Sequence, residues 1–272
     1  MDDPTKIDTT SRREFVEYYA KQSLTKATAD RFAGIRARVL SLVPAKSSNC
    51  ASLRMLDIGC GPGMQSVMWA QEGHEVYGLD INEPLIEVAR QRAREAGVTI
   101  EFRVGSAAAL PYETGSMDVC LMPELLEHVP DWQACVNEAV RILRPGGVLF
   151  LSTTNVLCPV QNEFELPLYS WYPGFLKRRY EKLAITSRPA LANFARYPAV
   201  HWFNYYQLRR HFHRFGMLCF DRFEMIDGNA GSMLRRSIIA LLHRSAFLRF
   251  VGQLCSTGTV VFAAKPQSET KQ

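Results

Sequence analysis

The sequence predicts an α/β protein built on a doubly wound, mostly parallel β-sheet. Between residues 54 and 154, short β-branched runs typical of buried strands alternate with segments whose apolar residues recur at helical spacing. Gly97 and the run Arg144-Pro145-Gly146-Gly147 contain residues that commonly end helices, and each directly follows a predicted helix. A strand–helix–strand rhythm is typical of parallel sheets that carry helices on both faces. The strands are predicted at 55–58, 76–79, 100–104, 117–121 and 148–152, and the helices at 64–72, 84–96 and 132–143.

The rhythm changes on both sides of this core. Residues 12–43 look helical and are followed by a polar linker, whereas residues 155–203 are rich in proline and aromatics and too long for an ordinary loop. Regular elements return as a helix at 205–215, strands at 218–225 and 259–264, and a basic amphipathic helix at 232–251. We therefore expect a seven-stranded sheet whose last strand is antiparallel. The predicted segments are 1–49, a helical segment and linker; 50–154, a ligand-binding core; 155–203, an insertion; and 204–272, which completes the sheet.

Composition and charge restrict the kind of protein. The chain is 47% hydrophobic, so it can bury a sizeable core, and it has no apolar run of the roughly 18 residues that a membrane span needs. Its first ten residues lack the apolar stretch of a secretory signal. The seven cysteines never form a C-x-x-C pair, so we expect reduced thiols and a cytoplasmic protein.

Positive charge is concentrated in the second half of the chain. Residues 151–272 carry 16 Lys/Arg and 7 Asp/Glu, whereas the rest carries 16 and 20. Either this half meets an anionic partner, such as a phosphate-bearing substrate, a lipid surface or nucleic acid, or it is simply a solvated basic face. An RNA partner would explain the charge equally well, but no recognised RNA-binding module is present, so nucleic acid is disfavoured.

A glycine-rich loop follows the first predicted strand and opens a helix. Its sequence is Asp57-Ile58-Gly59-Cys60-Gly61-Pro62-Gly63. Glycines let the backbone turn sharply and let a ligand press against the main chain. Asp80 lies about 20 residues further on, at the end of the second strand, where a carboxylate accepts hydrogen bonds from a ribose diol. The pattern therefore predicts a nucleoside site.

The loop favours one nucleoside over another. A dinucleotide fingerprint needs a third glycine at the position of Met64, and Asp57 would repel a pyrophosphate. A carboxylate at that position instead suits the cationic amino-acid end of S-adenosylmethionine. A nicotinamide-dependent oxidoreductase is thus the weaker alternative, and a tight turn without a ligand is weaker still.

Five stretches of the sequence carry a family resemblance: Met55–Gly63, Tyr77–Asp80, Gly105–Tyr112, Asp118–Val129 and Arg144–Gly147. Together they resemble the class I methyltransferases, which have a Rossmann-like fold, and most nearly the ubiquinone-biosynthesis O-methyltransferases and their type 11 relatives. The resemblance spans roughly residues 50–155.

The resemblance implies roles for particular residues. It places the methionine end of S-adenosylmethionine against the loop, the ribose at Asp80 and Ile81, and the adenine at Ser106 and Ala107. Many relatives have an acidic residue at 106 or 107, which this chain lacks. Pro123 would line the pocket near the methyl group. Arg31, or less readily Arg36 or the pair Tyr18-Tyr19, is a candidate for the donor's carboxylate. The implied donor site comprises Asp57, Gly59, Cys60, Gly61, Gly63, Asp80, Ile81, Ser106, Ala107, Pro123 and Arg31.

Glu124, Glu127 and His128 stand at the spacing of one helical turn and follow Pro123 directly. Three interpretations remain open. The turn caps a helix and shapes the pocket; or His128, with Glu124, is the catalytic base for a hydroxyl acceptor; or all three hold Mg²⁺, which would lower the pKa of a bound phenol. The metal interpretation is implied by the resemblance, since some quinone O-methyltransferases carry the same Glu-x-x-Glu-His run.

The insertion interleaves aromatic with basic side chains, including Trp171, Tyr172, Lys177 and Arg178. Insertions after the fifth strand of this fold lie where ligands bind, so we expect a lid over an acceptor site, although an extra packed subdomain is the plainer alternative. The expected acceptor is a small molecule, quinone-like or lipid-linked, and the product of the donor is S-adenosylhomocysteine. Aromatic and basic residues together also suit a peripheral contact with an anionic membrane. An S-adenosylmethionine-binding protein without activity remains an alternative.

Overall fold

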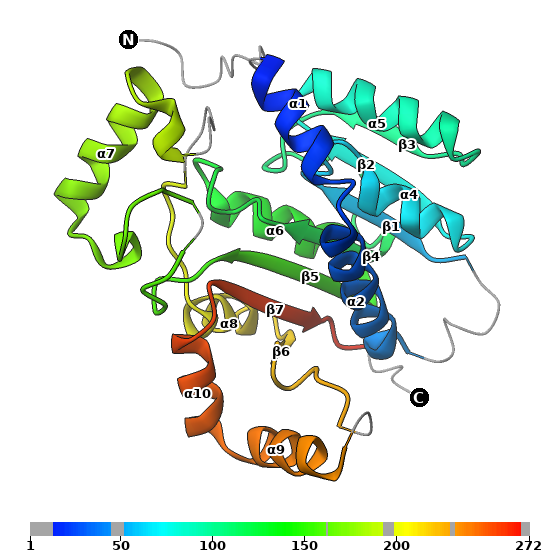
Figure 1. Ribbon diagram of the computed structural model, residues 1–272. Coiled ribbons are helices and arrows are strands. Elements are labelled where there is room, and N and C mark those ends of the chain that lie inside the picture. Colours follow the sequence, from blue (N-terminus) through cyan, green and yellow to red (C-terminus); the bar gives the residue numbers. More distant parts are fainter. Residues whose placement is uncertain (1–12, 45–51, 162, 193–198, 229–231, 268–272) are drawn as a thin grey trace. The chain divides into compact units, whose positions relative to one another are not determined.

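The computed structural model describes residues 13–44, 52–161, 163–192, 199–228 and 232–267. Within them, seven strands form one sheet in the order β3-β2-β1-β4-β5-β7-β6 (Figure 1). The pairs β1–β2, β1–β4 and β2–β3 are parallel, whereas β6–β7 is antiparallel. This confirms the predicted doubly wound, Rossmann-like sheet. The strands are β1 Arg54–Ile58, β2 Glu75–Asp80, β3 Glu101–Val104, β4 Met117–Pro123, β5 Leu143–Thr154, β6 Leu218–Asp221 and β7 Gly258–Ala264.

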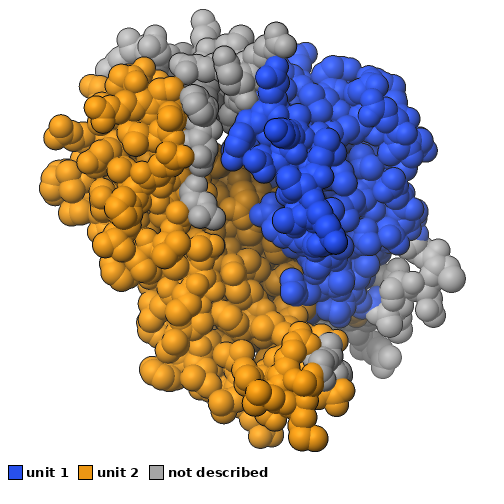
Figure 2. Space-filling model, in the orientation of Figure 1, with its two compact units in different colours: residues 1–122, 131–148 blue, residues 123–130, 149–272 orange. Residues whose placement is uncertain are grey.

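The chain divides into two compact units (Figure 2). Unit 1 comprises Met1–Met122 and Asp131–Val148, and unit 2 comprises Pro123–Pro130 and Leu149–Gln272. Strands β4 and β5 therefore each contribute residues to both units. The predicted division into four segments is a different partition of the chain and stays a prediction.

Unit 1 holds the first part of the sheet and, within the described ranges, five helices. Helices α4 and α5 pack on β2, while α1 contacts α5 and α2 contacts α4 (Figure 1). Polar residues fix where two of the helices begin: Asn82 Oδ1 accepts from Leu85 N at 3.1 Å, and Asp131 Oδ1 accepts from Ala134 N at 2.9 Å. The helices are α1 Arg13–Gln22, α2 Lys26–Leu42, α4 Met64–Gln71, α5 Glu83–Glu95 and α6 Trp132–Ile142.

Unit 2 contains the insertion, which has an aromatic core of its own. Tyr169 is fully buried and stacks on Phe164 with ring centroids 4.0 Å apart, and the ammonium of Lys177 lies 4.5 Å from the centre of the Trp202 ring. Much of the aromatic sequence therefore packs within the insertion. The helices of unit 2 are η1 Tyr169–Trp171, α7 Gly174–Thr186, η2 Pro189–Ala192, α8 Tyr205–His213, α9 Met233–Arg244 and α10 Ala246–Leu254.

Several element boundaries differ from the predicted ones. The helical pattern of 232–251 is broken at Ser245, whose extended backbone ends α9 and whose Oγ accepts from Leu248 N at the start of α10. The pattern of 12–43 is likewise broken before Thr25, which caps α2. Strand β6 ends at Asp221 because its Oδ1 accepts from Phe223 N and Glu224 N, which closes a turn.

Strand β5 begins earlier than expected, at Leu143, so that the glycine pair of the expected turn lies within the strand. Among the described residues, no helix combines the length and hydropathy needed to cross a bilayer. Cys50 lies outside the described residues. The six other cysteines are free thiols.

The contact between the glycine loop and α5 gives a stability test. Gly63 has a φ of +75°, and a Cβ there would lie 2.6 Å from Ala89 Cβ. Gly97 also has a positive φ, +66°, but its Cβ would meet nothing within 4 Å. We expect Gly63→Ala to lower the free energy of unfolding by about 3 kcal/mol, from crowding and strain together, and Gly97→Ala by about 1 kcal/mol from strain alone. Urea unfolding of both variants measures this, and equal losses would contradict the packing argument.

Candidate active site

The glycine loop after β1 is bonded to the end of β2. The N–H groups of Gly59 and Cys60 both donate to the carbonyl of Leu79, at 2.7 and 3.1 Å. Gly59, Gly61 and Gly63 all have positive φ, a region that side chains with a Cβ rarely enter. The loop thus takes this path because every second residue is glycine.

Asp80, the last residue of β2, also bonds to the loop. Its Oδ2 accepts from Gly61 N at 2.8 Å, and its Oδ1 accepts from Asn82 N at 2.8 Å. Burial raises the pKa of Asp80, while the backbone N–H groups of Asn82, Gly61 and Ile81 act to lower it. Each carboxylate oxygen has more than one acceptor site, so Asp80 retains capacity for hydroxyl donors beyond these amides.

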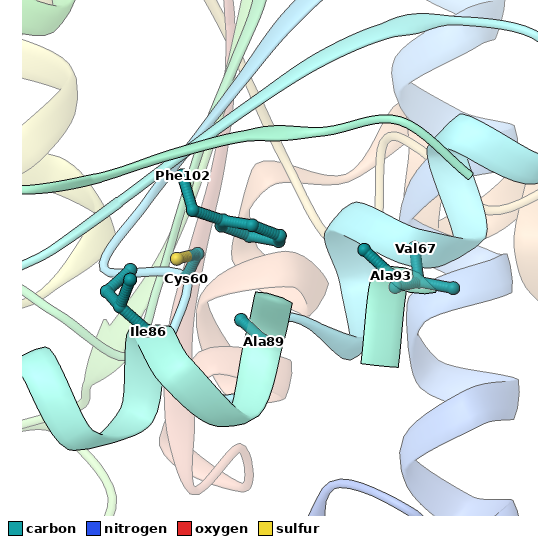
Figure 3. Close-up of a cluster of buried hydrophobic side chains, with 6 residues drawn as sticks. All are labelled: Cys60, Val67, Ile86, Ala89, Ala93 and Phe102. Carbon is teal, nitrogen blue, oxygen red and sulfur yellow. The ribbon is translucent and has the colours of Figure 1, made fainter. Parts of the chain in front are cut away.

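Cys60 and Gly61, neighbours in the loop, have different surroundings. Cys60 belongs to a buried cluster, which Figure 3 displays, and it contributes its side chain to the core of unit 1. A Cβ at Gly61, by contrast, would meet nothing within 4 Å. The loop therefore offers bare main chain and open space at Gly61. The cluster members are Cys60, Val67, Ile86, Ala89, Ala93 and Phe102.

Asp57 is a buried carboxylate at the end of β1. One oxygen, Oδ2, accepts from Ser66 Oγ at 2.7 Å, and the other, Oδ1, is buried without a hydrogen-bond partner among the described residues. Burial raises the pKa of Asp57 to about 7, against which the Ser66 hydrogen bond acts, and the negative charge of Asp80 raises it further. Such a group is stabilised as a carboxylate when a cation or a donor approaches its open oxygen.

The remaining candidates in unit 1 are placed less distinctly. Ser106 lies just after β3, where its Oγ accepts from Ala108 N at 3.2 Å, and Ala107 is buried. Arg31 is exposed on α2, with its guanidinium 5.2 Å from the centre of the Phe32 ring. Arg36 donates to the carbonyl of Met68 and pairs with Glu72 at 3.0 Å, so it serves the packing of α2 on α4.

Sequence reasoning missed Arg92, a residue that supports the loop. Its guanidinium donates to the carbonyl of Pro62 at 2.9 Å and to Ser23 Oγ and the carbonyl of Ala20 at 2.8 and 2.7 Å. The predicted helix face around 85–96 includes Arg92, but only the folded chain brings it to Pro62. It ties the loop to the end of α1.

The candidate residues of unit 2 begin at Pro123, the last residue of β4. Glu124 follows with a φ of +50°, one of only two positive values at non-glycine positions among the described residues. Its N–H donates to the carbonyl of Ser152 at 2.8 Å, and Ser152 Oγ donates to Glu124 Oε1 at 2.5 Å. Two bonds to β5 thus hold this residue in a costly backbone conformation, a feature that is frequent at functional sites.

Glu127 is fully buried. Its Oε2 accepts from Thr153 Oγ1 at 2.7 Å, whereas Oε1 has no hydrogen-bond partner among the described residues. Burial, and then the charges of Glu124 and Glu163, raise the pKa of Glu127 well above its ordinary value. A wholly buried acid with an open oxygen is costly to keep unless a cation or proton accompanies it.

Glu163, from the insertion, completes the acidic group. One carboxylate oxygen each of Glu124, Glu127 and Glu163 lies within 4.8 Å of the others. Burial and the charge of Glu124 raise the pKa of Glu163 to about 7. His128 Nε2 is 4.0 Å from Glu163 Oε2. The run from Glu124 to His128 folds as turns rather than as the expected helical turn, and Glu163, 35 positions along the chain from His128, was not detectable from local spacing.

Part of the chain is similar to known methyltransferases. Residues 56–151 match a family model described as a methyltransferase domain. The match covers less than half of the chain. A ubiquinone biosynthesis O-methyltransferase of Xanthomonas oryzae is similar to this chain, with 44% identity over 106 residues, which are 39% of this chain and 44% of the relative. The chain thus aligns with less than half of the length of that relative.

Solved structures show the same fold at low sequence identity. The YcgJ protein of Bacillus subtilis is similar over 86% of this chain and 99% of its own, with a TM-score of 0.53 and 20% identity. A structure from Methanosarcina mazei described as an S-adenosylmethionine-dependent methyltransferase is similar over 83% and 98%, with a TM-score of 0.51 and 21% identity.

The buried Asp57 carboxylate gives a pH-dependent prediction. Because the pKa is about 7 when folded and its ordinary value is 3.8, the folded protein keeps the proton over a range in which the unfolded chain has lost it. Stability therefore falls as pH rises from 3.8 to about 7 and changes no further above that. We expect Asp57→Asn to raise the free energy of unfolding of the ligand-free protein by about 2 kcal/mol at about pH 8. The gain should shrink as pH falls toward 3.8, the ordinary value.

Chemical unfolding at a series of pH values measures this effect. Glu113→Gln is the matched control, because Glu113 is an exposed carboxylate of the same unit. It should change stability by less than about 0.5 kcal/mol at every pH. If Asp57→Asn instead lowers the free energy of unfolding at high pH, the buried carboxylate does not destabilise the ligand-free protein.

Proposed function

We propose that this protein is an S-adenosylmethionine-dependent methyltransferase. The observation that carries the proposal is the pair of carboxylates, Asp57 and Asp80, on either side of a bare glycine loop that has open space at Gly61. S-adenosylmethionine, when bound, supplies the methyl group. The chain's own part is to bind and orient the donor, since a displacement at a sulfonium mainly needs alignment.

Each group of the donor has a complementary residue. The open oxygen of Asp57 suits the ammonium of the methionine moiety, and the remaining acceptor sites of Asp80 suit the two ribose hydroxyls. Gly59, Gly61 and Gly63 let the nucleoside approach the main chain, with Cys60 anchoring the loop in the core. Ile81, Ser106 and Ala107 are proposed beside the adenosine, Pro123 near the methyl group and Arg31 at the carboxylate.

A dinucleotide-dependent oxidoreductase fits this site less well. A pyrophosphate would face the buried carboxylate of Asp57, and the two negative charges would repel each other. Dinucleotide sites instead bring pyrophosphate to backbone N–H groups. Here the N–H groups of Gly59, Cys60 and Gly61 donate to Leu79 and Asp80.

We propose a small-molecule hydroxyl as the acceptor, quinone-like or lipid-linked. The relatives named as ubiquinone biosynthesis O-methyltransferases support this class. Transfer to a hydroxyl requires removal of its proton, and we propose Glu124 and His128 for that role. Glu124 is exposed and anchored by Ser152, so its carboxylate combines access with a fixed position.

Mg²⁺ fits the acidic group of unit 2. Hard cations prefer oxygen ligands, and the buried, unbonded Oε1 of Glu127 is an unsatisfied acceptor beside two further carboxylates. As the alternative to a base role for Glu124, we propose Glu124, Glu127 and Glu163 as the residues that would hold the ion, with His128 at its edge. A bound Mg²⁺ would lower the pKa of a phenol acceptor.

Donor binding is the first test of the proposed function. We expect the protein to bind S-adenosylhomocysteine in a calorimeter, and Asp80→Ala to weaken binding by about a hundredfold, because it removes two hydrogen bonds to a charged acceptor. Gly61→Ala should also weaken binding, because its methyl group would enter the open space. Gly97→Ala, with a similar backbone strain away from the loop, is the matched control.

Two results would contradict the donor assignment: no heat of binding with S-adenosylhomocysteine, or binding of NADH in its place. A protein that binds the donor without turnover is distinguished by a panel of phenols, quinols and lipid-linked alcohols. Formation of S-adenosylhomocysteine with one of them, reduced by Glu124→Gln, supports the methyltransferase. Donor binding without any turnover supports the inactive alternative.

The metal assignment predicts an effect on stability. We expect Mg²⁺ at about a hundredfold excess over its dissociation constant to stabilise the protein by about 3 kcal/mol. Glu127→Gln should remove this gain and should stabilise the metal-free protein, because it removes a buried charge. Glu165→Gln, an exposed neighbour of Glu163, should keep the gain. Thermal unfolding with and without Mg²⁺, and the electron paramagnetic resonance of Mn²⁺ as a direct probe, measure both effects; a gain that persists in Glu127→Gln would contradict the site.

A further inference from the structure

Helices α9 and α10 carry an unusual concentration of exposed apolar side chains. Of the 19 large hydrophobic side chains that are exposed among the described residues, seven lie between Met233 and Val251. Scattered exposed apolar residues are ordinary, but a concentration of this kind marks an interaction surface. The seven are Met233, Leu234, Ile238, Leu241, Phe247, Phe250 and Val251.

These residues recur at helical spacing. Leu234, Ile238 and Leu241 stand at i, i+4 and i+7 on α9, and Phe247 stands three and four residues before the pair Phe250-Val251 on α10. Each helix therefore presents an apolar stripe on one face. Phe247 is 71% exposed and Leu234 is 72% exposed, so the stripes are not the packed sides of these helices.

The opposite side of the helix pair is anchored within unit 2. Arg249 donates to the carbonyls at the end of α9, Leu242 and His243, and pairs with Asp221 at 3.6 Å and Glu224 at 3.5 Å. Gly252 lies under Phe223, where a Cβ would come within 2.5 Å of the ring. The exposed stripes are therefore the faces left over when the helix pair is already packed.

The charge of this segment identifies the partner class. Residues 228–268 contain no aspartate or glutamate, and Arg235, Arg236 and Arg244 are all exposed on α9. Apolar stripes flanked by arginines are typical of helices that lie in the interface of an anionic bilayer. A second copy of the chain would bring the same arginines against each other, which disfavours self-association.

We propose that α9 and α10 form a membrane-docking surface that inserts its apolar stripes among anionic lipids. This surface lies outside residues 56–151, which match the methyltransferase model, so the proposal does not rest on the proposed function. Docking here would bring the chain to a phase in which an apolar acceptor is concentrated.

Co-sedimentation with vesicles tests the docking surface. We expect the whole protein to pellet with vesicles of mixed phosphatidylcholine and phosphatidylglycerol, and to be released at high salt. The triple variant Leu234→Ser, Leu241→Ser, Phe247→Ser should lower the partition coefficient by at least about tenfold, through lost apolar contact. The double variant Arg235→Gln, Arg236→Gln should lower it by about tenfold on anionic vesicles only.

Helix α7 supplies the matched control, because it is also basic and exposes Phe175 and Ile185. The variant Phe175→Ser, Ile185→Ser should pellet like the parent protein. The proposal is overturned if the protein does not pellet, if the α7 variant alone loses binding, or if the triple variant only changes a dimer into a monomer in the ultracentrifuge. Calorimetry with S-adenosylhomocysteine on the triple variant keeps this outcome separate from any failure of the proposed function.

Discussion

The hydrogen bond from Gly61 N to Asp80 is the contact on which the site of unit 1 depends. It joins the loop after β1 to the end of β2, and Asn82 N bonds to the same carboxylate at the start of α5. One acid therefore fixes the loop and the beginning of a helix together. Because those backbone amides already hold its carboxylate, Asp80 is positioned before any ligand arrives. Less conformational entropy is therefore lost on binding.

Buried acids recur in both units. Asp57 in unit 1 and Glu127 in unit 2 each have one oxygen bonded to a hydroxyl and the other without a hydrogen-bond partner among the described residues. Each lowers the stability of the ligand-free protein, since burial raises its pKa. A chain keeps such groups where function needs them, and a cationic donor and a divalent ion are the complements proposed here. The proposed roles of these two residues therefore come at the expense of stability.

The accuracy of the sequence predictions follows the range of the interactions concerned. The strands and helices of the core were predictable to within a few residues at most ends, because burial periodicity and capping residues such as Asn82 are local signals. The breaks at Ser245 and before Thr25 were missed, because a capping serine or threonine within an amphipathic pattern looks like a helical residue. Glu163 and Arg92 were missed as site residues, since neither has a local motif.

The sequence by itself determined the doubly wound sheet, the glycine loop and the acid at the end of β2, because these follow from period, turn chemistry and spacing within one strand–helix–strand unit. Only the tertiary structure decided which groups face each other across the chain. It brought Glu163 to Glu124 and Glu127, turned Cys60 into the core and left Gly61 open. It also separated the packed side of α9 and α10 from the exposed side. Such contacts depend on burial and on partners distant in sequence, which no local pattern encodes.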